Sequence, residues 1–333
     1  MKTSYTSNLP KIAIIVLNYN NWRQTIECLE SLSKLDYPNF QIILIDNASQ
    51  NNSVEMLKKW AKQNLYQACK DHQNSAEGSS IEIVEYTSYE IKTGKLKSET
   101  DFVNTTNPKK LVLIKSDKNL GYSGGNNLGI IYAIEMGYDA VLIANPDVII
   151  PDTNFLNILS KTLFSDEKIV LVGPRVLTPN GKQQSPLREP SYFEELLYPL
   201  KKTEFIINSE NLLEPITVDK VHGCCFLART KFLKEAGLLD ENVFLFSEEA
   251  IISFKAKKYG GLIVFEPRTF VIHKHINTMA KPNFFKIAIQ SRLYALKKYK
   301  NIDGLKYLFI SLKYYANFAF YLIKYNIKKA ILR

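Results

Sequence analysis

Polar side chains follow two of the short apolar runs in this sequence, and their types suit a nucleotide ligand. Asp46 and Asn47 come directly after one run, and Asn145 and Asp147 follow another. A carboxylate such as Asp46 accepts the ring N–H of a uracil or thymine base, and Asn47 adds a donor. Asp147, which follows a proline, suits a divalent cation that bridges a diphosphate. Ordinary Asp/Asn turn chemistry is the alternative at both places.

A glycine-rich segment, Asn119–Asn127 (NLGYSGGNN), separates another apolar run from a helical pattern. Glycines such as Gly121 and Gly125 let a ligand approach the backbone, and a helix N-terminus attracts phosphate. The spacing matches neither the G-x-G-x-x-G fingerprint nor a P-loop, so neither standard nucleotide motif is present. A tight turn followed by a helix cap explains the segment equally well.

Two adjacent acids, Glu248 and Glu249, follow Ser247 in the segment FLFSEE. Ser247 is typical of a helix N-cap, and acids in the first helical turn complement the helix dipole. That structural role is the simpler interpretation. The chemical interpretation makes one of the two carboxylates a general base.

Histidine and cysteine supply a further set of candidates. His273 and His275 follow an apolar run at alternate positions, so only one of them can point inward, as a metal ligand or as a structural residue. The four cysteines include the adjacent Cys224 and Cys225, which is not a metal-ligand spacing. No disulfide framework is indicated, so we expect a reducing compartment.

These clusters need a scaffold that brings strand ends together. Short β-branched runs without alternation fit strands buried on both faces of a parallel sheet: Lys11–Leu17, Gln41–Ile45, Leu111–Lys115, Ala140–Ala144 and Ile169–Val172. Apolar residues at helical spacing predict helices between these runs, over 22–35, 128–134 and 155–163. The alternation predicts an α/β sheet, whose ligands bind beyond the carboxyl ends of the strands.

The rest of the chain is less regular. Residues 67–110 are polar and predict a surface insertion, partly mobile, with one short strand at Ile81–Tyr86. Further expected elements are a strand over Val218–Ala228, helices over Thr230–Ala236 and Ser247–Lys258, and strands over Leu262–Phe265 and Phe270–Ile272. We expect one domain over residues 10–280 and a tail of basic amphipathic helices over 281–333.

Positive charge is concentrated in that tail. The net charge is +10, yet residues 281–333 hold twelve Lys or Arg and one acid, so the remainder is close to neutral and does not indicate a nucleic-acid-binding body. Basic residues among aromatic ones suit an anionic membrane surface, and helices packed on the main domain are the alternative. With no secretory signal and no apolar stretch long enough to span a membrane, we expect a cytoplasmic protein, peripheral on the inner face of the cell membrane.

The order of the motifs is more specific than any one of them. NYN, DNAS, NLGYSGGNN, NPD, HGCCFLA, FLFSEE and HKH together resemble a family 2 glycosyltransferase with the GT-A fold, over residues 10–280 without the insertion. The pattern is most similar to bacterial rhamnosyltransferases and related enzymes of polysaccharide assembly. The resemblance implies an α/β fold with a mixed, mostly parallel, Rossmann-like sheet flanked by helices, and a C-terminal helical extension.

The resemblance also implies roles for individual residues. A nucleotide sugar would be held at the strand ends and the glycine-rich segment, by Asn18, Tyr19, Asp46, Asn47, Gly121, Gly125, Asn126, Asn145 and Gly223. Mn²⁺ or Mg²⁺ would be held by Asp147 and His273, with His275 as the alternative to His273. Glu249 would be the general base, with Glu248 as the alternative.

The implied reaction is inverting transfer of a sugar from a UDP- or dTDP-sugar to a hydroxyl group of a lipid-linked glycan. Glu249 stands where many members carry Asp, and Ile251 where a second Asp is common, so a catalytically inactive nucleotide-sugar-binding module of the same fold is the main alternative. A pyrophosphorylase would need an N-terminal glycine-rich loop, and Lys11–Asn21 contains no glycine. A nucleic-acid-binding protein would depend on the tail, and we expect no nucleic acid partner.

Overall fold

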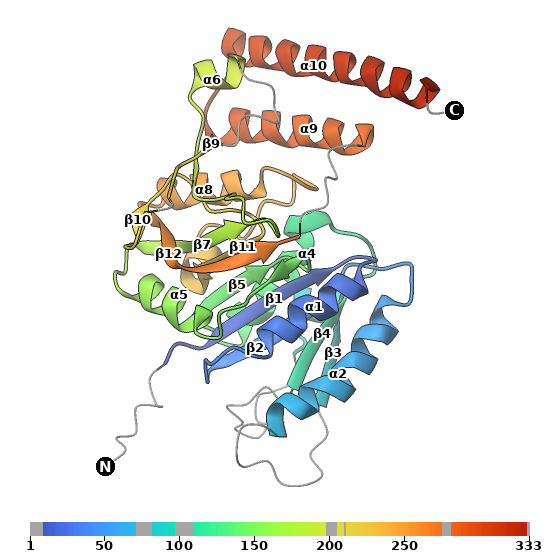
Figure 1. The fold of residues 1–333 in the computed structure, drawn as a ribbon, viewed down its shortest axis with the longest axis vertical. Coiled ribbons are helices and arrows are strands. Elements are labelled where there is room, and N and C mark those ends of the chain that lie inside the picture. The colour runs from blue at the N-terminus through green and yellow to red at the C-terminus, as the bar shows by residue number, and fades with distance from the viewer. Residues whose placement is uncertain are drawn as a thin grey trace.

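The computed structural model describes residues 9–70, 82–96, 110–197, 205–209, 211–274 and 281–331. One mixed sheet runs through the molecule in the order β10-β12-β7-β11-β5-β1-β2-β4-β3, with β6 paired to β12 (Figure 1). Most neighbouring strands are parallel, which confirms the α/β sheet expected from the apolar runs.

The first half alternates strands and helices, as predicted. Its elements are β1 (Ile12–Asn18), α1 (Trp22–Leu32), β2 (Phe40–Asp46), α2 (Ser53–Lys70), β3 (Glu82–Thr87), α3 (Ser88–Lys92), β4 (Lys110–Lys115), α4 (Gly121–Glu135) and β5 (Ala140–Ala144). The strand expected inside the polar insertion is confirmed as β3, which pairs in parallel with β4 at the sheet edge. The mobility expected for the insertion concerns residues that lie largely outside the described ranges.

The second half completes the sheet and adds the tail. Its elements are β6 (Val148–Ile149), α5 (Phe155–Phe164), β7 (Ile169–Leu177), β8 (Leu187–Arg188), α6 (Tyr192–Leu197), β9 (Phe205–Ile206), β10 (Ile216–Thr217), β11 (Cys225–Arg229), α7 (Thr230–Glu235), α8 (Glu248–Lys258), β12 (Leu262–His273), α9 (Pro282–Tyr299) and α10 (Gly304–Ile331). Strand β11 runs antiparallel to both β5 and β7, which makes the sheet mixed.

Three predicted boundaries are wrong. The two strands expected between 262 and 272 form one strand, β12, whose register shifts after Glu266, so a bulge interrupts the apolar pattern without ending the strand. The strand expected over Val218–Ala228 begins only at Cys225, because the residues before it form a loop. Helix α4 begins at Gly121, so most of the glycine-rich segment is helical.

Helices cover both faces of the sheet. On β1, Ile12, Ile14 and Val16 belong to the core cluster shared with residues of α1, α2 and α5, while Ala13 and Ile15 belong to the cluster shared with residues of α4, α7 and α8. All five side chains are fully buried, which explains why this run shows no alternation of polar and apolar residues. The polar candidate residues Asn18, Asp46 and Asn145 lie at the carboxyl ends of β1, β2 and β5.

The tail forms the two predicted helices, which lie beyond α8 on one end of the molecule (Figure 1). Helix α9 packs on α8, and α10 packs on α9 and α6. Apolar side chains such as Phe285, Ile289, Ile310 and Tyr314 fill the space between them. Among the described residues, no helix is both long enough and apolar enough to cross a membrane.

Candidate active site

The ends of β1 and β2 carry a hydrogen-bonded polar cluster. Asn18 lies opposite Asp46 in the parallel register, and its Nδ2 donates to Asp46 Oδ1 at 2.8 Å. The backbone N–H and the hydroxyl of Ser49 donate to the two oxygens of the same carboxylate, at 3.0 and 2.6 Å. Asn18 and Asp46 are buried, whereas Tyr19 is 43% exposed. The cluster therefore fixes the Asp46 carboxylate, and Tyr19 lies at its rim.

Asn47 holds the start of α4 against the end of β2. Its Nδ2 donates to Asn119 Oδ1 at 3.0 Å and to the Gly121 carbonyl at 3.1 Å. Its Oδ1 accepts the backbone N–H of Leu120 at 2.9 Å. The Asn47 amide thus positions the glycine-rich helix start beside Asp46.

Gly125 and Asn126 lie on the buried side of α4. A Cβ on Gly125 would lie 2.5 Å from Leu17 Cδ1, so glycine lets α4 approach β1 closely. Asn126 Nδ2 donates to the Tyr122 carbonyl at 3.0 Å, within the same helix. Both residues therefore serve helix packing, and their contact with a nucleotide stays a prediction.

Asp147 and His273 come together as predicted. His273 Nε2 lies 3.4 Å from Asp147 Oδ2, at the end of β12. Gln184 Oε1 lies 3.1 Å from His273 Nδ1, and since an amide oxygen only accepts, Nδ1 carries a proton and Nε2 faces Asp147. Metal-binding histidines are commonly oriented in this way through their second nitrogen. The pair therefore fits a divalent cation, while His275 lies outside the described residues.

Asn145 and Gly223 flank this pair. The backbone N–H of Asn145 donates to the Cys224 carbonyl at 2.8 Å, which ties the end of β5 to the loop before β11. The Gly223 carbonyl accepts the Tyr122 hydroxyl at 2.6 Å, which ties the same loop to α4. The loop is therefore held from both sides.

The two acids reach the same loop from α8. A Cβ on Gly223 would lie 3.4 Å from Glu249 Oε2 and 3.9 Å from Glu248 Oε1, so both carboxylates face Gly223. The chain turns into α8 through Phe246 and Ser247, which have φ angles of 71° and 65°. Ser247 is the N-cap residue of α8, as expected, but its side chain makes no cap hydrogen bond. Two consecutive non-glycine residues in the left-handed region store strain that aims the acids at the loop.

The adjacent acids repel each other in a buried setting. Burial and the neighbouring Glu249 raise the pKa of Glu248 to about 8. Glu248 Oε2 is buried and has no hydrogen-bond partner among the described residues. At neutral pH the pair therefore carries one negative charge and one proton.

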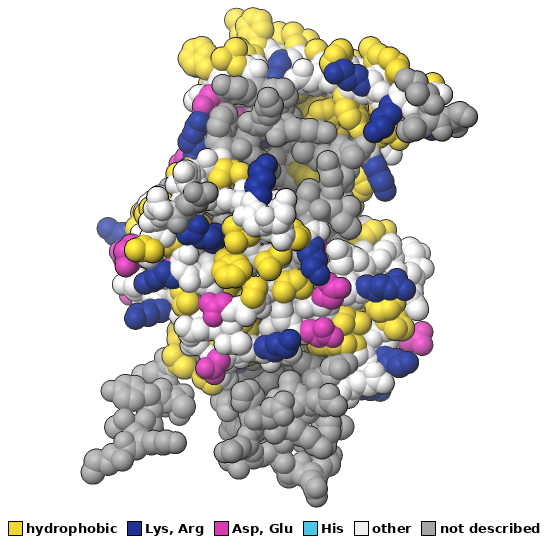
Figure 2. All heavy atoms as spheres, in the orientation of Figure 1, with side chains coloured by type: hydrophobic (Ala, Val, Ile, Leu, Met, Phe, Trp, Pro, Cys, Tyr) yellow, Lys and Arg dark blue, Asp and Glu magenta, His cyan; other side chains and the backbone are white. Residues whose placement is uncertain are grey.

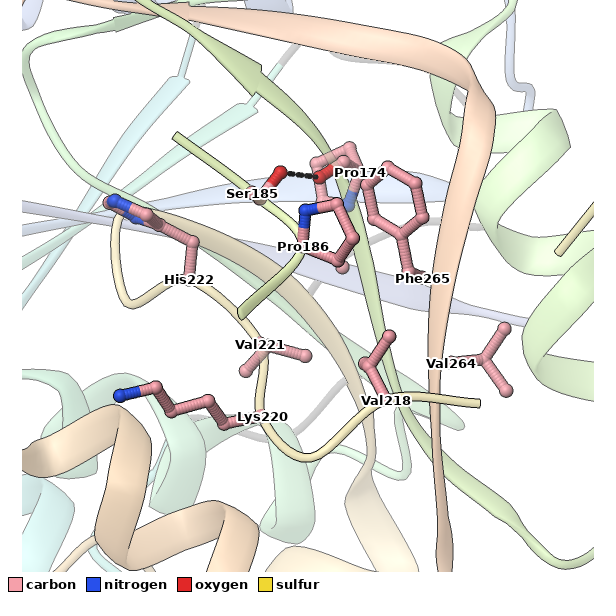
Figure 3. A pocket seen from close by; sticks show the side chains of 10 residues that line it. Pro174, Ser185, Pro186, Val218, Lys220, Val221, His222, Val264 and Phe265 are labelled. Atoms are coloured by element: carbon pink, nitrogen blue, oxygen red, sulfur yellow. Dashed lines mark hydrogen bonds between the residues drawn. The ribbon is translucent and has the colours of Figure 1, made fainter. Parts of the chain in front are cut away.

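A small pocket lies behind this loop, lined by residues of β7, β12 and the segment 218–222. Figure 3 shows its lining, where the Ser185 hydroxyl donates to the Pro174 carbonyl and His222 points away from the other side chains. Its volume of about 10 Å³ suits about one water molecule. The pocket is too small for a nucleotide sugar.

Two contacts escape the sequence analysis. Gln184 lies in an irregular segment, 89 residues from the His273 that it orients, and no motif marks it. Ligand atoms of His222, Cys224 and His273 all lie within 4.8 Å of one another. The adjacency of Cys224 and Cys225 was therefore misleading, because the companions of Cys224 are His222 in the same loop and His273 from another strand. The spacing His222-Gly223-Cys224 was the only available signal.

Comparison with known proteins gives a consistent result. The sequence pattern of the family described as "Glycosyl transferase family 2" matches residues 13–83. The chain is 30% identical over 208 residues to the "Low-salt glycan biosynthesis hexosyltransferase Agl10" of Haloferax volcanii. This match covers 57% of the chain and 65% of that relative, so the chain spans just under two thirds of its length.

Two solved structures have the same fold. The mannosyltransferase PcManGT from Pyrobaculum calidifontis, in complex with GDP-Man and Mn²⁺, has a TM-score of 0.56 at 15% identity, over 92% of this chain and 70% of that chain. GalNAc-T7 with UDP, GalNAc and Mn²⁺ has a TM-score of 0.57 at 15% identity, over 89% of this chain and 50% of that chain. The likeness confirms the GT-A fold.

Proposed function

We propose that this chain is a family 2 glycosyltransferase that transfers a hexose from a nucleotide sugar to a hydroxyl group of a glycan. One observation carries the proposal: the acidic pair and the cation pair lie on the two sides of a single loop. Glu248 and Glu249 face Gly223, and the ring of His222 lies 5.4 Å from the ring of His273, which faces Asp147. Such a site at the carboxyl ends of parallel strands suits group transfer.

The donor is a UDP- or dTDP-sugar. Asn18 and Ser49 hold the Asp46 carboxylate in place, where it accepts the ring N–H of the base. Asp147 and His273 would hold Mn²⁺ or Mg²⁺, which would supply positive charge for the leaving diphosphate. The neighbours solved with GDP-Man or with UDP, each together with Mn²⁺, support a nucleotide-bearing donor and a divalent cation.

Transfer is a single displacement with inversion at the anomeric carbon. Glu249 accepts the proton of the acceptor hydroxyl. The two carboxyl groups share one proton at neutral pH, so one carboxylate stays ionised and can act as the base. A competent base at this position favours an enzyme over an inactive sugar-nucleotide-binding module.

Calorimetric titration with UDP-, dTDP- and GDP-sugars, including dTDP-rhamnose, with and without Mn²⁺, tests the donor assignment. We expect one uridine or thymidine donor to bind, and Asp147→Ala to abolish the dependence of binding on Mn²⁺. Failure of every donor to bind would refute the proposed function.

Turnover with the identified donor tests the base. Glu249→Gln should bind the donor normally and lower the rate by about 10²–10⁴-fold. Glu235→Gln, whose side chain is exposed on α7, is the matched control and should keep the wild-type rate. A fully active Glu249→Gln variant would show that Glu249 is not the general base and would point to Glu248. Donor binding without turnover in the wild-type chain would indicate a catalytically inactive binding module.

We further propose that the acceptor is lipid-linked and that α10 lies on an anionic membrane. Opposite its packed face, α10 carries a second apolar stripe, whose members recur every three or four residues: Leu305, Phe309, Leu312, Ala316, Phe320, Ile323 and Ile327. Its large members are between 53% and 70% exposed. Lysines border the stripe, α10 contains no acid, and Figure 2 shows yellow and dark blue side chains along this end of the molecule. Such a helix suits the lipid interface.

Sedimentation with anionic and neutral vesicles tests this surface. The wild-type chain should pellet with anionic vesicles only, and the Phe309→Ser/Phe320→Ser variant should stay in solution. Leu213→Ser removes a side chain that is 77% exposed elsewhere on the surface, and it should pellet like the wild type. Undiminished pelleting of the double variant would refute the assignment to α10.

A further inference from the structure

A thiol lies beside the predicted cation pair. Cys224 belongs to the loop before β11, two residues after His222, and His273 ends β12. One ligand atom from each of these residues lies within 4.8 Å of the other two. Cys224 and His273 are 2% and 5% exposed, whereas His222 is half-buried. Two segments that are far apart in the sequence, the loop before β11 and the end of β12, thus bring two imidazoles and one thiol close together.

The two histidines are already oriented as ligands. His273 directs Nε2 toward Asp147, because Gln184 accepts the proton of Nδ1. His222 Nδ1 accepts the backbone N–H of Cys224 at 3.2 Å, so this nitrogen carries a lone pair inside the cluster. Each ring therefore has one unprotonated nitrogen, as a neutral imidazole ligand has, and a metal on His222 Nδ1 would replace its hydrogen bond to Cys224.

The donor set does not match a cation that prefers oxygen. Mg²⁺ takes oxygen ligands, and Mn²⁺ is also well suited by carboxylate and carbonyl oxygens, whereas two imidazoles and a thiolate suit Zn²⁺. Asp147 is the one carboxylate that the described residues place against His273, at 3.4 Å. Two nitrogens, one sulfur and one carboxylate oxygen make a set of four, which is the number that Zn²⁺ takes in structural sites.

We propose that His222, Cys224, His273 and Asp147 form a binding site for a thiophilic divalent cation such as Zn²⁺. On binding, the metal–sulfur bond forms, the S–H bond of Cys224 breaks, and the proton passes to solvent. Because His273 and Asp147 belong to both sites, Zn²⁺ and the Mn²⁺ or Mg²⁺ of the transfer reaction exclude each other. This competition rests on the proposed function, whereas the thiophilic site itself does not.

Cobalt is the probe, because Co²⁺ occupies zinc sites and absorbs light. Full-length protein titrated with Co²⁺ under anaerobic conditions should develop a thiolate-to-metal charge-transfer band in the near ultraviolet, and stoichiometric Zn²⁺ should erase it. Cys224→Ser should lose the band and weaken Zn²⁺ binding by more than about 100-fold, since loss of even an outer-shell partner costs up to that factor. Cys225→Ser, at the adjacent buried cysteine, is the matched control and should retain the band.

A spectrum without a thiolate band in the wild-type chain would overturn the proposal, as would an unchanged band in Cys224→Ser. If Cys224→Ser does not fold, as circular dichroism would show, Cys224→Ala replaces it. Mn²⁺-dependent donor binding is measured on separate, cobalt-free portions of the same preparations: a cobalt band in one portion without donor binding in the other would refute the transfer reaction alone. Donor binding without the band would refute the thiophilic site alone.

Discussion

Glu248 keeps a proton at a pH where exposed glutamates have lost theirs. Its carboxyl is buried beside Glu249, and these two causes raise its pKa from 4.5 to about 8. The unfolded chain has neither burial nor a fixed neighbour, so its Glu248 ionises near pH 4.5. Between these two values the folded state binds one proton more than the unfolded state. Stability therefore falls as the pH rises through this window.

Replacement of Glu248 by Gln should remove that loss. We expect the wild-type chain to lose stability between pH 5 and pH 8, by on the order of a few kcal/mol, and Glu248→Gln to lose much less. Urea unfolding at both pH values measures the difference, with Glu235→Gln as the exposed control. Parallel pH profiles of wild type and Glu248→Gln would show that Glu248 is not the buried acid.

Single residues were predictable where the sheet alone sets their position. Asn18 and Asp46 end neighbouring parallel strands, so their contact follows from the apolar runs before them. Asp147 reaches His273 by another route, because it directly precedes β6, whose Val148 pairs with His273 of β12. Gln184 and Cys224 were not predictable, because irregular loops bring them to His273 and no periodicity describes a loop.

At the scale of elements, the glycine-rich segment joins α4 to the turn before α8. Gly121 has a φ of 71°, and a Cβ there would lie 2.3 Å from the Phe244 carbonyl oxygen. The backbone N–H of Tyr122 donates to the same carbonyl at 2.9 Å. The turn that aims the acidic pair is thus built against the first residue of α4.

Gly121→Ala should therefore disturb both elements. We expect the free energy of unfolding to fall by roughly 2–4 kcal/mol, because of left-handed strain and displacement of Phe244. Turnover should fall as well. Gly137→Ala is the matched control, because Gly137 has a φ of 66° and nothing within 4 Å of its Cβ position. The Gly137→Ala variant should be destabilised only by the left-handed strain, by roughly 1–2 kcal/mol, and should keep its activity. Equal losses in denaturant unfolding would show that the contact with Phe244 is unimportant.

Most elements were predictable from apolar patterns, and the failures share a cause. Strands β1, β2, β4 and β5 are buried on both faces, so their runs are continuous and easily recognised. Helix α4 begins earlier than expected, because burial against β1 overrides the low helix propensity of Gly124 and Gly125. Tertiary contacts that a local pattern does not record decide such boundaries.

At the scale of the whole molecule, buried charges fasten the tail to the domain. Arg292 of α9 donates to both oxygens of Glu195 at 2.8 Å and to Glu189 at 2.5 Å. Tyr314 of α10 donates to Glu195 as well, and Glu195 and Arg292 are 0% and 5% exposed. The basic count of the tail predicted a charged surface, yet Arg292 is used internally. Lys298 likewise donates to Asp240 at 3.0 Å.

The tail should therefore detach when this cluster is broken. Glu195→Ala leaves the Arg292 guanidinium buried beside Glu189 alone, and removal of one partner from a buried pair costs roughly 3–5 kcal/mol. Because Glu189 still pairs with Arg292, we expect the free energy of unfolding, measured in urea, to fall by about 3 kcal/mol. Helix α10 should then become more accessible to protease than in the wild type, since Tyr314 loses its acceptor.

Two further variants test whether burial of the Glu195–Arg292 pair, and not the loss of any ion pair, causes the destabilisation. Glu27→Ala breaks the Lys274–Glu27 pair, whose members are 40% and 48% exposed, and exposed pairs contribute at most about 1 kcal/mol. The double variant Glu195→Met/Arg292→Met replaces both buried charges by apolar side chains, and it should be more stable than Glu195→Ala because no unpaired guanidinium remains. If Glu195→Ala costs no more than Glu27→Ala, the cluster does not hold the tail, and apolar packing between α9 and α10 must account for its attachment.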